Sequence, residues 1–89
     1  MFEWDEAKSE ATLRLRGFNF DYAALIFENP ILEFDDMRRA YGERRICAIG
    51  RAERDMLFVV YTWRGRSRRI ISARLAQRKE RDAYRQAFG

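Results

Sequence analysis

The sequence contains no histidine, and this absence limits the chemistry that the protein can perform. Histidine is the usual general acid or base near neutral pH, and it is a common ligand of zinc. Histidine-based proton transfer is therefore excluded, and a zinc site would lack its usual ligands. The chain also has a single cysteine, Cys47, which excludes an internal disulfide and fits a reducing cytoplasm.

Long apolar segments and familiar cofactor motifs are missing as well. No apolar stretch approaches the roughly 20 residues that a membrane-spanning helix needs, so we expect no membrane partner. The stretch from Met1 to Asp5 lacks the positively charged and then apolar order of a secretion signal. There is no phosphate-binding loop, no cluster of Cys and His and no nucleophile elbow. The sequence thus predicts a cytoplasmic protein without a cofactor or a metal site.

Charge is abundant and unevenly placed in the chain. The 89 residues include 18 Lys and Arg against 14 Asp and Glu, and a chain of this length predicts a single domain, 1–89, with a modest core. From Arg64 to the C-terminus there are nine Lys and Arg residues and only two acids, Glu80 and Asp82. This local excess favours a polyanionic partner such as nucleic acid, and the alternative is a soluble, positively charged surface.

Capping and helix-breaking residues divide the N-terminal third into a short strand and two helices. The aromatic stretch 2–4 favours a strand, and Asp5 is a suitable N-cap for a helix that ends at Gly17. Asn19 can cap a second helix. This helix should end before Pro30, because the residue preceding a proline avoids helical angles.

Four further strands and a last helix are predicted at 31–36, 44–50, 56–61, 68–75 and from about Gln77. The fold class is therefore α+β: an antiparallel sheet of four to five strands, with two N-terminal helices packed on it and a C-terminal helix. Grouped helices and grouped strands place the helices on one face of the sheet. The strand at 56–61 is apolar at nearly every position, which is typical of a strand covered on both faces. The strand at 68–75 alternates, which predicts Arg68, Ile70, Ser72 and Arg74 on one face.

Arginines around this last hairpin form the candidate site. Arginine side chains suit phosphate oxygens, and aromatic rings can stack on unpaired bases. Arg64 and Arg74 lie at the ends of the hairpin, where we expect them to converge on one cleft and stabilise charge during RNA cleavage by the ribose 2′-oxygen. Other candidates are Glu43, Arg45 and Lys8 for catalysis, and Arg68, Arg69, Trp63 and Tyr84 for RNA contact. For any single arginine, the alternative is a solvated surface charge.

Two charged residues fall on the apolar stripes of predicted helices. Lys8 is in line with Ala11 and Leu15, so either its stem packs and its amine reaches solvent, or the amine points into a cleft. Glu80 is in line with Tyr84 and needs a partner, for which Arg74 is the nearest candidate. Such a pair would dock the helix or orient the arginine toward substrate. Glu43 or Lys8 could act as a base only with a shifted pKa.

A series of short motifs runs in a fixed order along nearly the whole chain. They are Phe2-Glu3-Trp4-Asp5 with Lys8, Gly17-Phe18-Asn19-Phe20 with Phe27-Glu28-Asn29-Pro30, Glu43-Arg44-Arg45, the stretch 59–64, and Arg69-Ile70-Ile71-Ser72-Ala73-Arg74 followed by Glu80 and Tyr84. In this order the motifs resemble the BrnT family of bacterial type II toxins, which is similar to the RelE-like ribonucleases.

The resemblance implies a toxin that cleaves mRNA and inhibits translation. It also implies an antitoxin with a ribbon-helix-helix domain, through which alone DNA would be contacted, and autorepression of the operon by the complex. Where the family's first helix usually closes with His-Gly, this chain has Arg16-Gly17. The hypothesis is therefore a metal-independent endoribonuclease. The alternatives are a catalytically weak partner in an antitoxin repressor complex, which the missing histidine favours, and a plain RNA-binding domain.

Overall fold

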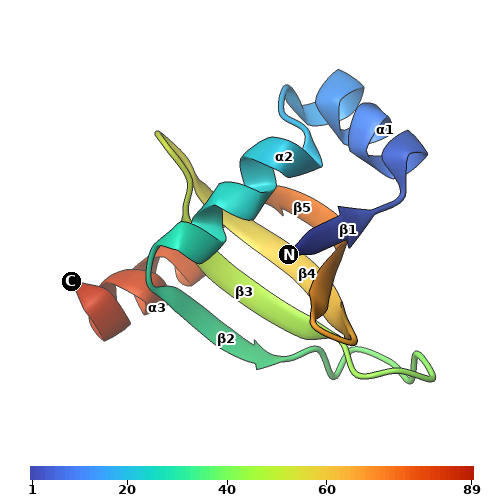
Figure 1. The fold of residues 1–89 in the computed structure, drawn as a ribbon. Helices are drawn as coiled ribbons and strands as arrows, with labels where there is room; N and C mark the ends of the chain where they lie inside the picture. The colour runs from blue at the N-terminus through green and yellow to red at the C-terminus, as the bar shows by residue number, and fades with distance from the viewer.

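A five-stranded sheet carries the fold in the computed structural model, which describes residues 1–89 (Figure 1). The strands lie in the order β1-β5-β4-β3-β2, with bounds β1 Phe2–Trp4, β2 Ile31–Asp35, β3 Ile46–Arg51, β4 Met56–Arg64 and β5 Ser67–Leu75. All neighbouring pairs are antiparallel except β1 and β5, which are parallel. The prediction of an antiparallel sheet is therefore wrong for β1. No hairpin joins β1 to β5, so nothing in the local sequence imposes an antiparallel pairing on them.

Most of the predicted helix boundaries are confirmed. Helix α1 (Glu6–Arg16) begins after Asp5, whose carboxylate accepts a hydrogen bond from the Ala7 amide, and it ends at Gly17 in the left-handed region, with φ of 86°. The predicted second helix is divided into α2 (Phe20–Ala23) and a 3₁₀ helix, η1 (Ala24–Glu28), whose tighter turns lead into Asn29 and Pro30. Helix α3 spans Arg78–Phe88. None of these helices is long and apolar enough to cross a membrane.

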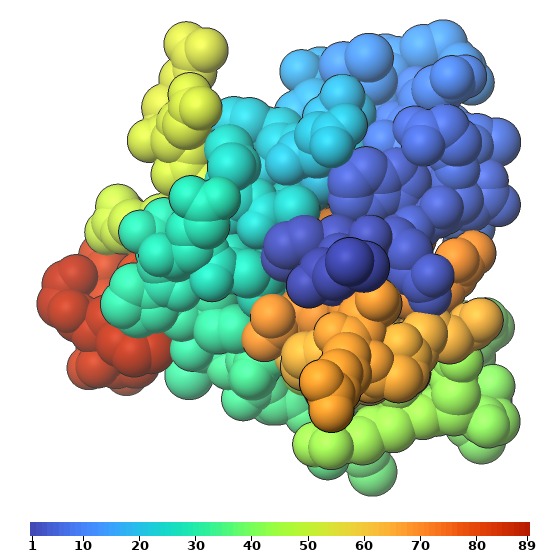
Figure 2. Space-filling view, in the orientation of Figure 1, coloured from blue at the N-terminus to red at the C-terminus, as the bar shows by residue number.

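The helices are divided between the two faces of the sheet, so the expectation that they share one face is wrong. Helices α2 and η1 cover what we call the N-terminal face, which is turned toward the viewer in Figure 2, and α1 lies beside β5 at its margin. Helix α3 packs on the opposite, C-terminal face, where Tyr84 and Ala76 join a second buried cluster with Cys47, Ile49, Phe58 and Val60. The apolar stretch in β4 explains this division. Its consecutive apolar residues point alternately to both faces, and each face needs a cover.

Gly50 in β3 permits the close approach of η1 to the sheet. A Cβ atom at this position would lie 2.9 Å from Cβ of Ile26 and 3.0 Å from Cγ2 of Ile31. Both distances are shorter than ordinary van der Waals contact, and Ile26 is fully buried. The absence of a side chain at Gly50 therefore lets η1 lie directly on the strand.

A β-bulge in β5 changes which arginines share a face. Val60 pairs with Ser72 and Tyr61 pairs with Ile70, which leaves Ile71 as the extra residue. Ile70 and Ala73 consequently belong to the same core cluster, although strict alternation would separate them. The prediction that Arg68 and Arg74 lie on one face is therefore wrong. Arg68 packs against rings on the N-terminal face, whereas Arg74 lies over Phe58 on the C-terminal face.

Candidate nucleic-acid interface

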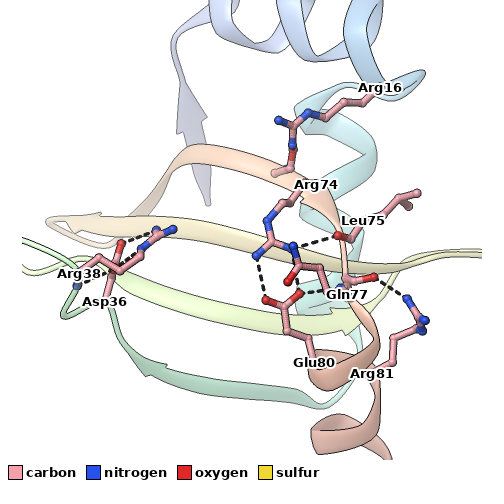
Figure 3. A network of polar contacts seen from close by, with 10 residues as sticks. Arg16, Asp36, Arg38, Arg74, Leu75, Gln77, Glu80 and Arg81 are labelled. Carbon is pink, nitrogen blue, oxygen red and sulfur yellow. Dashed lines mark hydrogen bonds and ion pairs between the residues drawn. The ribbon is translucent and has the colours of Figure 1, made fainter.

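Arg74 in β5 and Glu80 in the first turn of α3 form a bidentate pair on the C-terminal face (Figure 3). Both guanidinium-to-carboxylate distances are 2.8 Å, and Arg74 also lies 4.1 Å above the ring of Phe58. Glu80 additionally accepts a hydrogen bond from the backbone amide of Gln77, which caps the helix. The predicted pair is thus confirmed, and it both docks α3 and fixes the orientation of Arg74.

A second bidentate pair, which the sequence analysis missed, lies in the connection after β2. Asp36 accepts hydrogen bonds from Nε and a terminal nitrogen of Arg38, both at 2.7 Å. The Asp36 side chain is only 1% exposed, whereas that of Arg38 is 62% exposed. Asp36 and Arg38 stand two residues apart in a polar stretch, so periodicity gave no sign that one would be buried beneath the other.

The two pairs border one hollow on the C-terminal face. Its volume is about 380 Å³, and its lining includes Phe34, Met37, Cys47 and Phe58 in addition to the two ion pairs. The ring of Phe34 is 47% exposed and lies 6.1 Å from the ring of Phe58. The hollow therefore combines two cations on its walls with an accessible aromatic ring.

The same face continues toward the β4–β5 turn as a second group of charges. Arg45 donates a hydrogen bond to Glu43 at 3.3 Å, and a terminal nitrogen of Arg64 lies 3.9 Å from the other oxygen of the same carboxylate. Arg45 also lies 4.0 Å above the ring of Tyr41. Arg69 in β5 lies opposite Thr62 in β4, near the same end of the sheet as this group of charges. The structure thus brings together Glu43, Arg45 and Arg64, as the sequence analysis proposed for the site.

Arg64 and Arg74 do not converge on one point, which corrects the expectation from their places in the hairpin. Arg64 is at the turn, whereas Arg74 pairs with Phe58, six residues earlier in β4. Six residues of an extended strand span about 20 Å, because each residue advances the chain by roughly 3.3 Å. The two arginines therefore occupy the two ends of one elongated basic surface on the C-terminal face.

Lys8, Arg68 and Trp63 lie away from this surface. Lys8 is exposed on α1, and the inward residue of that helix is Ser9, whose hydroxyl accepts a hydrogen bond from the Phe20 amide. Lys8, Ala11 and Leu15 do share a face of α1, as predicted, and they line a separate hollow of about 190 Å³ beside β5, although Lys8 and Leu15 stay exposed. Arg68 lies 4.6 Å above the Trp63 ring and also stacks on two further rings of the N-terminal face, so these two candidate RNA contacts face away from Arg74.

Tyr84 is buried, which removes it from the candidates for RNA contact. Its ring is 3% exposed within the second core cluster, and its hydroxyl donates a hydrogen bond to the Pro30 carbonyl. Arg16, which stands where the resemblance leads one to expect histidine, donates a hydrogen bond to the Ala73 carbonyl in β5. Arg16 thus holds the end of α1 against the strand that carries Arg74.

The ionisable groups in the hollow are set for binding rather than for proton transfer. Hydrogen bonds from Arg38 hold the pKa of Asp36 far below its ordinary value, and those from Arg74 lower the pKa of Glu80. Burial raises the pKa of the Cys47 thiol to about 11. Both carboxylates are therefore ionised and the thiol is neutral near pH 7. No group of three or more His, Cys, Asp or Glu side chains is arranged to hold a metal ion.

A comparison with protein families gives the identity of this arrangement. Residues 4–80 match the family described as the ribonuclease toxin, BrnT, of type II toxin-antitoxin systems. The chain belongs to the BrnT family. It is accordingly a ribonuclease toxin of a type II toxin-antitoxin system, and this membership implies an antitoxin partner. A search of curated proteins finds no match to the chain. The matched range includes Glu43, Arg64, Arg74 and Glu80, and thus both ends of the basic surface.

Proposed function

We propose that this BrnT protein is a metal-independent endoribonuclease that cleaves mRNA and thereby inhibits translation, with RNA bound along the C-terminal face. The observation that carries the proposal is the gathering of cationic side chains on this partly open face. Arg38 and Arg74 border its hollow, and Arg45, Arg64 and Arg69 surround its other end. Guanidinium groups suit a phosphate backbone because they offer several N–H donors in one plane.

The group around Glu43 supplies the chemistry that cleavage needs at one phosphate. Glu43 accepts the proton of the ribose 2′-hydroxyl, and the 2′-oxygen then bonds to phosphorus. Arg45 and Arg64 stabilise the negative charge that develops on the phosphate oxygens. The bond from phosphorus to the 5′-oxygen breaks, and that oxygen takes a proton from solvent. The contacts of Glu43 at 3.3 and 3.9 Å support this assignment, since they are looser than the bidentate pairs of the hollow.

Arg74 serves in this proposal as a positioning residue about 20 Å along β4 from the reacting group. It contacts a phosphate a few nucleotides away from the bond that is cut and holds the strand in register with Glu43. Its guanidinium is fixed by Glu80 and supported by the Phe58 ring before substrate binds, so little freedom is lost on binding. No step in this scheme requires a metal ion, because arginines carry the charge stabilisation.

Cleavage by the purified protein in excess EDTA tests the proposal. The wild type should cut single-stranded RNA under these conditions. Glu43→Gln should lower kcat by roughly 10²–10⁴, which is the usual contribution of general base catalysis. Arg66→Ala is the matched control, because Arg66 is an exposed arginine in the neighbouring turn and should leave cleavage unchanged. Loss of all cleavage in EDTA, restored by magnesium, would contradict the metal-independent mechanism, and full activity of Glu43→Gln would contradict the base.

A second candidate function is a catalytically weak toxin that acts mainly as the antitoxin's partner in a DNA-bound repressor. The observation that favours it is Arg16, which stands where the family resemblance leads one to expect a histidine and donates a hydrogen bond to the Ala73 carbonyl. Overexpression in bacteria distinguishes the two functions. Growth arrest with loss of mRNA supports the ribonuclease, whereas normal growth with retained operator binding by the complex supports the second function.

The proposed partner is a ribbon-helix-helix antitoxin whose complex with this chain represses the operon. The basic C-terminal face supports this proposal, since an acidic antitoxin segment could cover the same arginines that contact RNA. In this arrangement DNA is contacted through the antitoxin, and neutralisation follows from direct competition with RNA.

A further inference from the structure

The hollow between the two bidentate pairs has features that phosphate binding alone does not require. Three of the five N–H groups of Arg74 are used by the Glu80 carboxylate and the Leu75 carbonyl. Two N–H groups of Arg38 are used by Asp36. Each arginine is therefore held rigidly by one side of its guanidinium and keeps further donors without a protein partner. Two pre-oriented donor groups on opposite walls suit the oxygens of one nucleotide and its neighbour.

Phe34 gives the hollow an apolar surface next to these donors. Its ring is about half exposed and stands beside Phe58, which is itself covered by Arg74. An exposed phenylalanine on a sheet face costs free energy in water, yet α3 leaves it uncovered. Aromatic rings beside arginines bind single-stranded nucleic acids by stacking on bases, which only unpaired bases permit.

We propose that this hollow is a subsite for one unpaired nucleotide, with Phe34 stacking on the base and Arg38 and Arg74 contacting the flanking phosphates. The inference rests on the proposed ribonuclease function and adds a substrate class to it: single-stranded RNA, recognised a few nucleotides from the bond that is cut. The volume of about 380 Å³ and its two polar walls fit such an occupant.

Asp36 makes Arg38 a built part of this subsite rather than a surface charge. Its buried carboxylate receives three hydrogen bonds from Arg38, two from the guanidinium and one from the backbone amide. Removing the guanidinium alone would leave that carboxylate buried without a counter-charge. The informative variant is therefore the double substitution Asp36→Asn with Arg38→Ala, which removes both charges together.

Binding of non-cleavable RNA, measured by fluorescence anisotropy, tests the subsite. The probes are a single-stranded RNA with methylated 2′-hydroxyls and the duplex of the same sequence. Phe34→Ala should weaken single-strand binding roughly tenfold or more, since stacking on one base contributes about that much. It should leave duplex binding unchanged, and Phe34→Trp should restore single-strand binding. Arg66→Ala, which alters an exposed arginine outside the hollow, is the control for loss of one positive charge.

The double variant of Asp36 and Arg38 gives an independent measure. It should weaken single-strand binding and reduce the slope of log affinity against log salt by about 0.7, the value expected for one lost phosphate contact. Equal binding by wild type and both variants, with normal RNA cleavage by the wild type, would overturn the subsite and leave the ribonuclease function intact. Reduced antitoxin affinity with unchanged RNA binding would assign the hollow to the antitoxin instead. Absence of any RNA binding or cleavage by the wild type would overturn the inference together with the function on which it rests.

Discussion

At the scale of single residues, the structure pairs its most enclosed carboxylates with arginines that remain partly exposed. Asp36 and Glu80 both lie beneath a guanidinium, and each receives two hydrogen bonds from it. A carboxylate that is removed from water needs such a partner to stay ionised. The same geometry fixes Arg38 and Arg74 in place, so the stability of the fold and the shape of the basic surface depend on the same contacts.

Substitution of Glu80 tests this dual role. Glu80→Gln should lower the free energy of unfolding by about 1–3 kcal/mol, because it leaves the half-buried Arg74 without a counter-charge. RNA affinity should also fall, since the guanidinium is no longer held in position. Asp82→Asn on the exposed side of α3 is the matched control and should change neither. Thermal unfolding and RNA binding by the same samples check both effects. An unchanged melting temperature would show that the pair does not dock the helix.

The stability lost in Glu80→Gln should depend on pH, and its direction follows from the lowered pKa of Glu80. Arg74 lowers the folded-state pKa of Glu80 below its ordinary value of 4.5, so the pair contributes its full stability above that pH. The contribution is lost as the pH falls through the lower, folded-state pKa. The difference in melting temperature between wild type and Glu80→Gln should therefore be constant near pH 7 and shrink toward pH 3. A difference that grows in acid would contradict the assignment.

At the scale of secondary-structure elements, two features decide the arrangement. Close packing at Gly50 positions η1 on the sheet, and the bulge in β5 decides which face each arginine of that strand occupies. The bulge at Ile71 reverses the order of faces within one strand, so Arg68 and Arg74 serve opposite sides of the sheet. Helix η1 lies against β3 at Gly50, where the chain has no side chain. The contact of η1 with β3 closes the core of the N-terminal face.

Gly50→Ala tests the importance of this contact. The added methyl group would meet Cβ of Ile26 at 2.9 Å, and a buried β-branched residue cannot move aside easily. We expect a loss of about 1–3 kcal/mol in the free energy of unfolding, which is typical of overpacked cores. Gly65→Ala is the control, since nothing lies within 4 Å of a Cβ there and only its φ of +60° opposes the substitution. Chemical denaturation of both variants is the measurement, and a Gly50→Ala protein as stable as wild type would show that η1 can shift freely.

At the scale of the whole molecule, the two faces of the sheet differ in their positive charge and in the helices that pack on them. Helices α2 and η1 cover much of the N-terminal face, where the β4–β5 end stays open in Figure 2, and α3 covers part of the C-terminal face. The last 26 residues contain half of the 18 Lys and Arg residues but only two of the 14 acids, and β5 and α3 place Arg69, Arg74 and Arg81 on or beside this partly covered face. One side of the molecule is thus left for a polyanion or an acidic partner.

The antitoxin complex gives a prediction at this scale. We expect an acidic antitoxin segment to lie over the C-terminal face, because opposite charges steer association and arginines pair with carboxylates. Hydrogen exchange should show new protection between Arg64 and Tyr84, and Phe88, which is half exposed, can add an apolar contact. The complex should melt well above the free toxin, because the antitoxin binds only the folded form. Protection confined to α1 and α2 in an inactive complex would show that inhibition acts from a distance.

Local sequence determined the elements of this protein and some of its contacts. Asp5 and Gly17 bound the first helix, Pro30 follows the second helical segment, and Gly65 joins β4 to β5, because caps and turns depend on a few neighbouring residues. The pairing of Glu80 with Arg74 was also predictable, since a carboxylate on the apolar stripe of a helix needs a cation and Arg74 is the last arginine of the preceding strand. The motifs along the chain also sufficed to identify the family.

Tertiary structure alone decided how these elements meet. The parallel pairing of β1 depends on contacts between residues more than 60 positions apart, for which no turn gives a direction. The bulge at Ile71 depends on how β5 registers with β4, and it separated Arg68 from Arg74 against the alternation of the sequence. Asp36, Tyr84 and Ser9 are buried because distant segments of the chain pack against them. The periodicity of a single helix or loop carries no information about such packing. The hollow beside Phe34 exists only because α3 docks on a face that the sequence had not assigned to it.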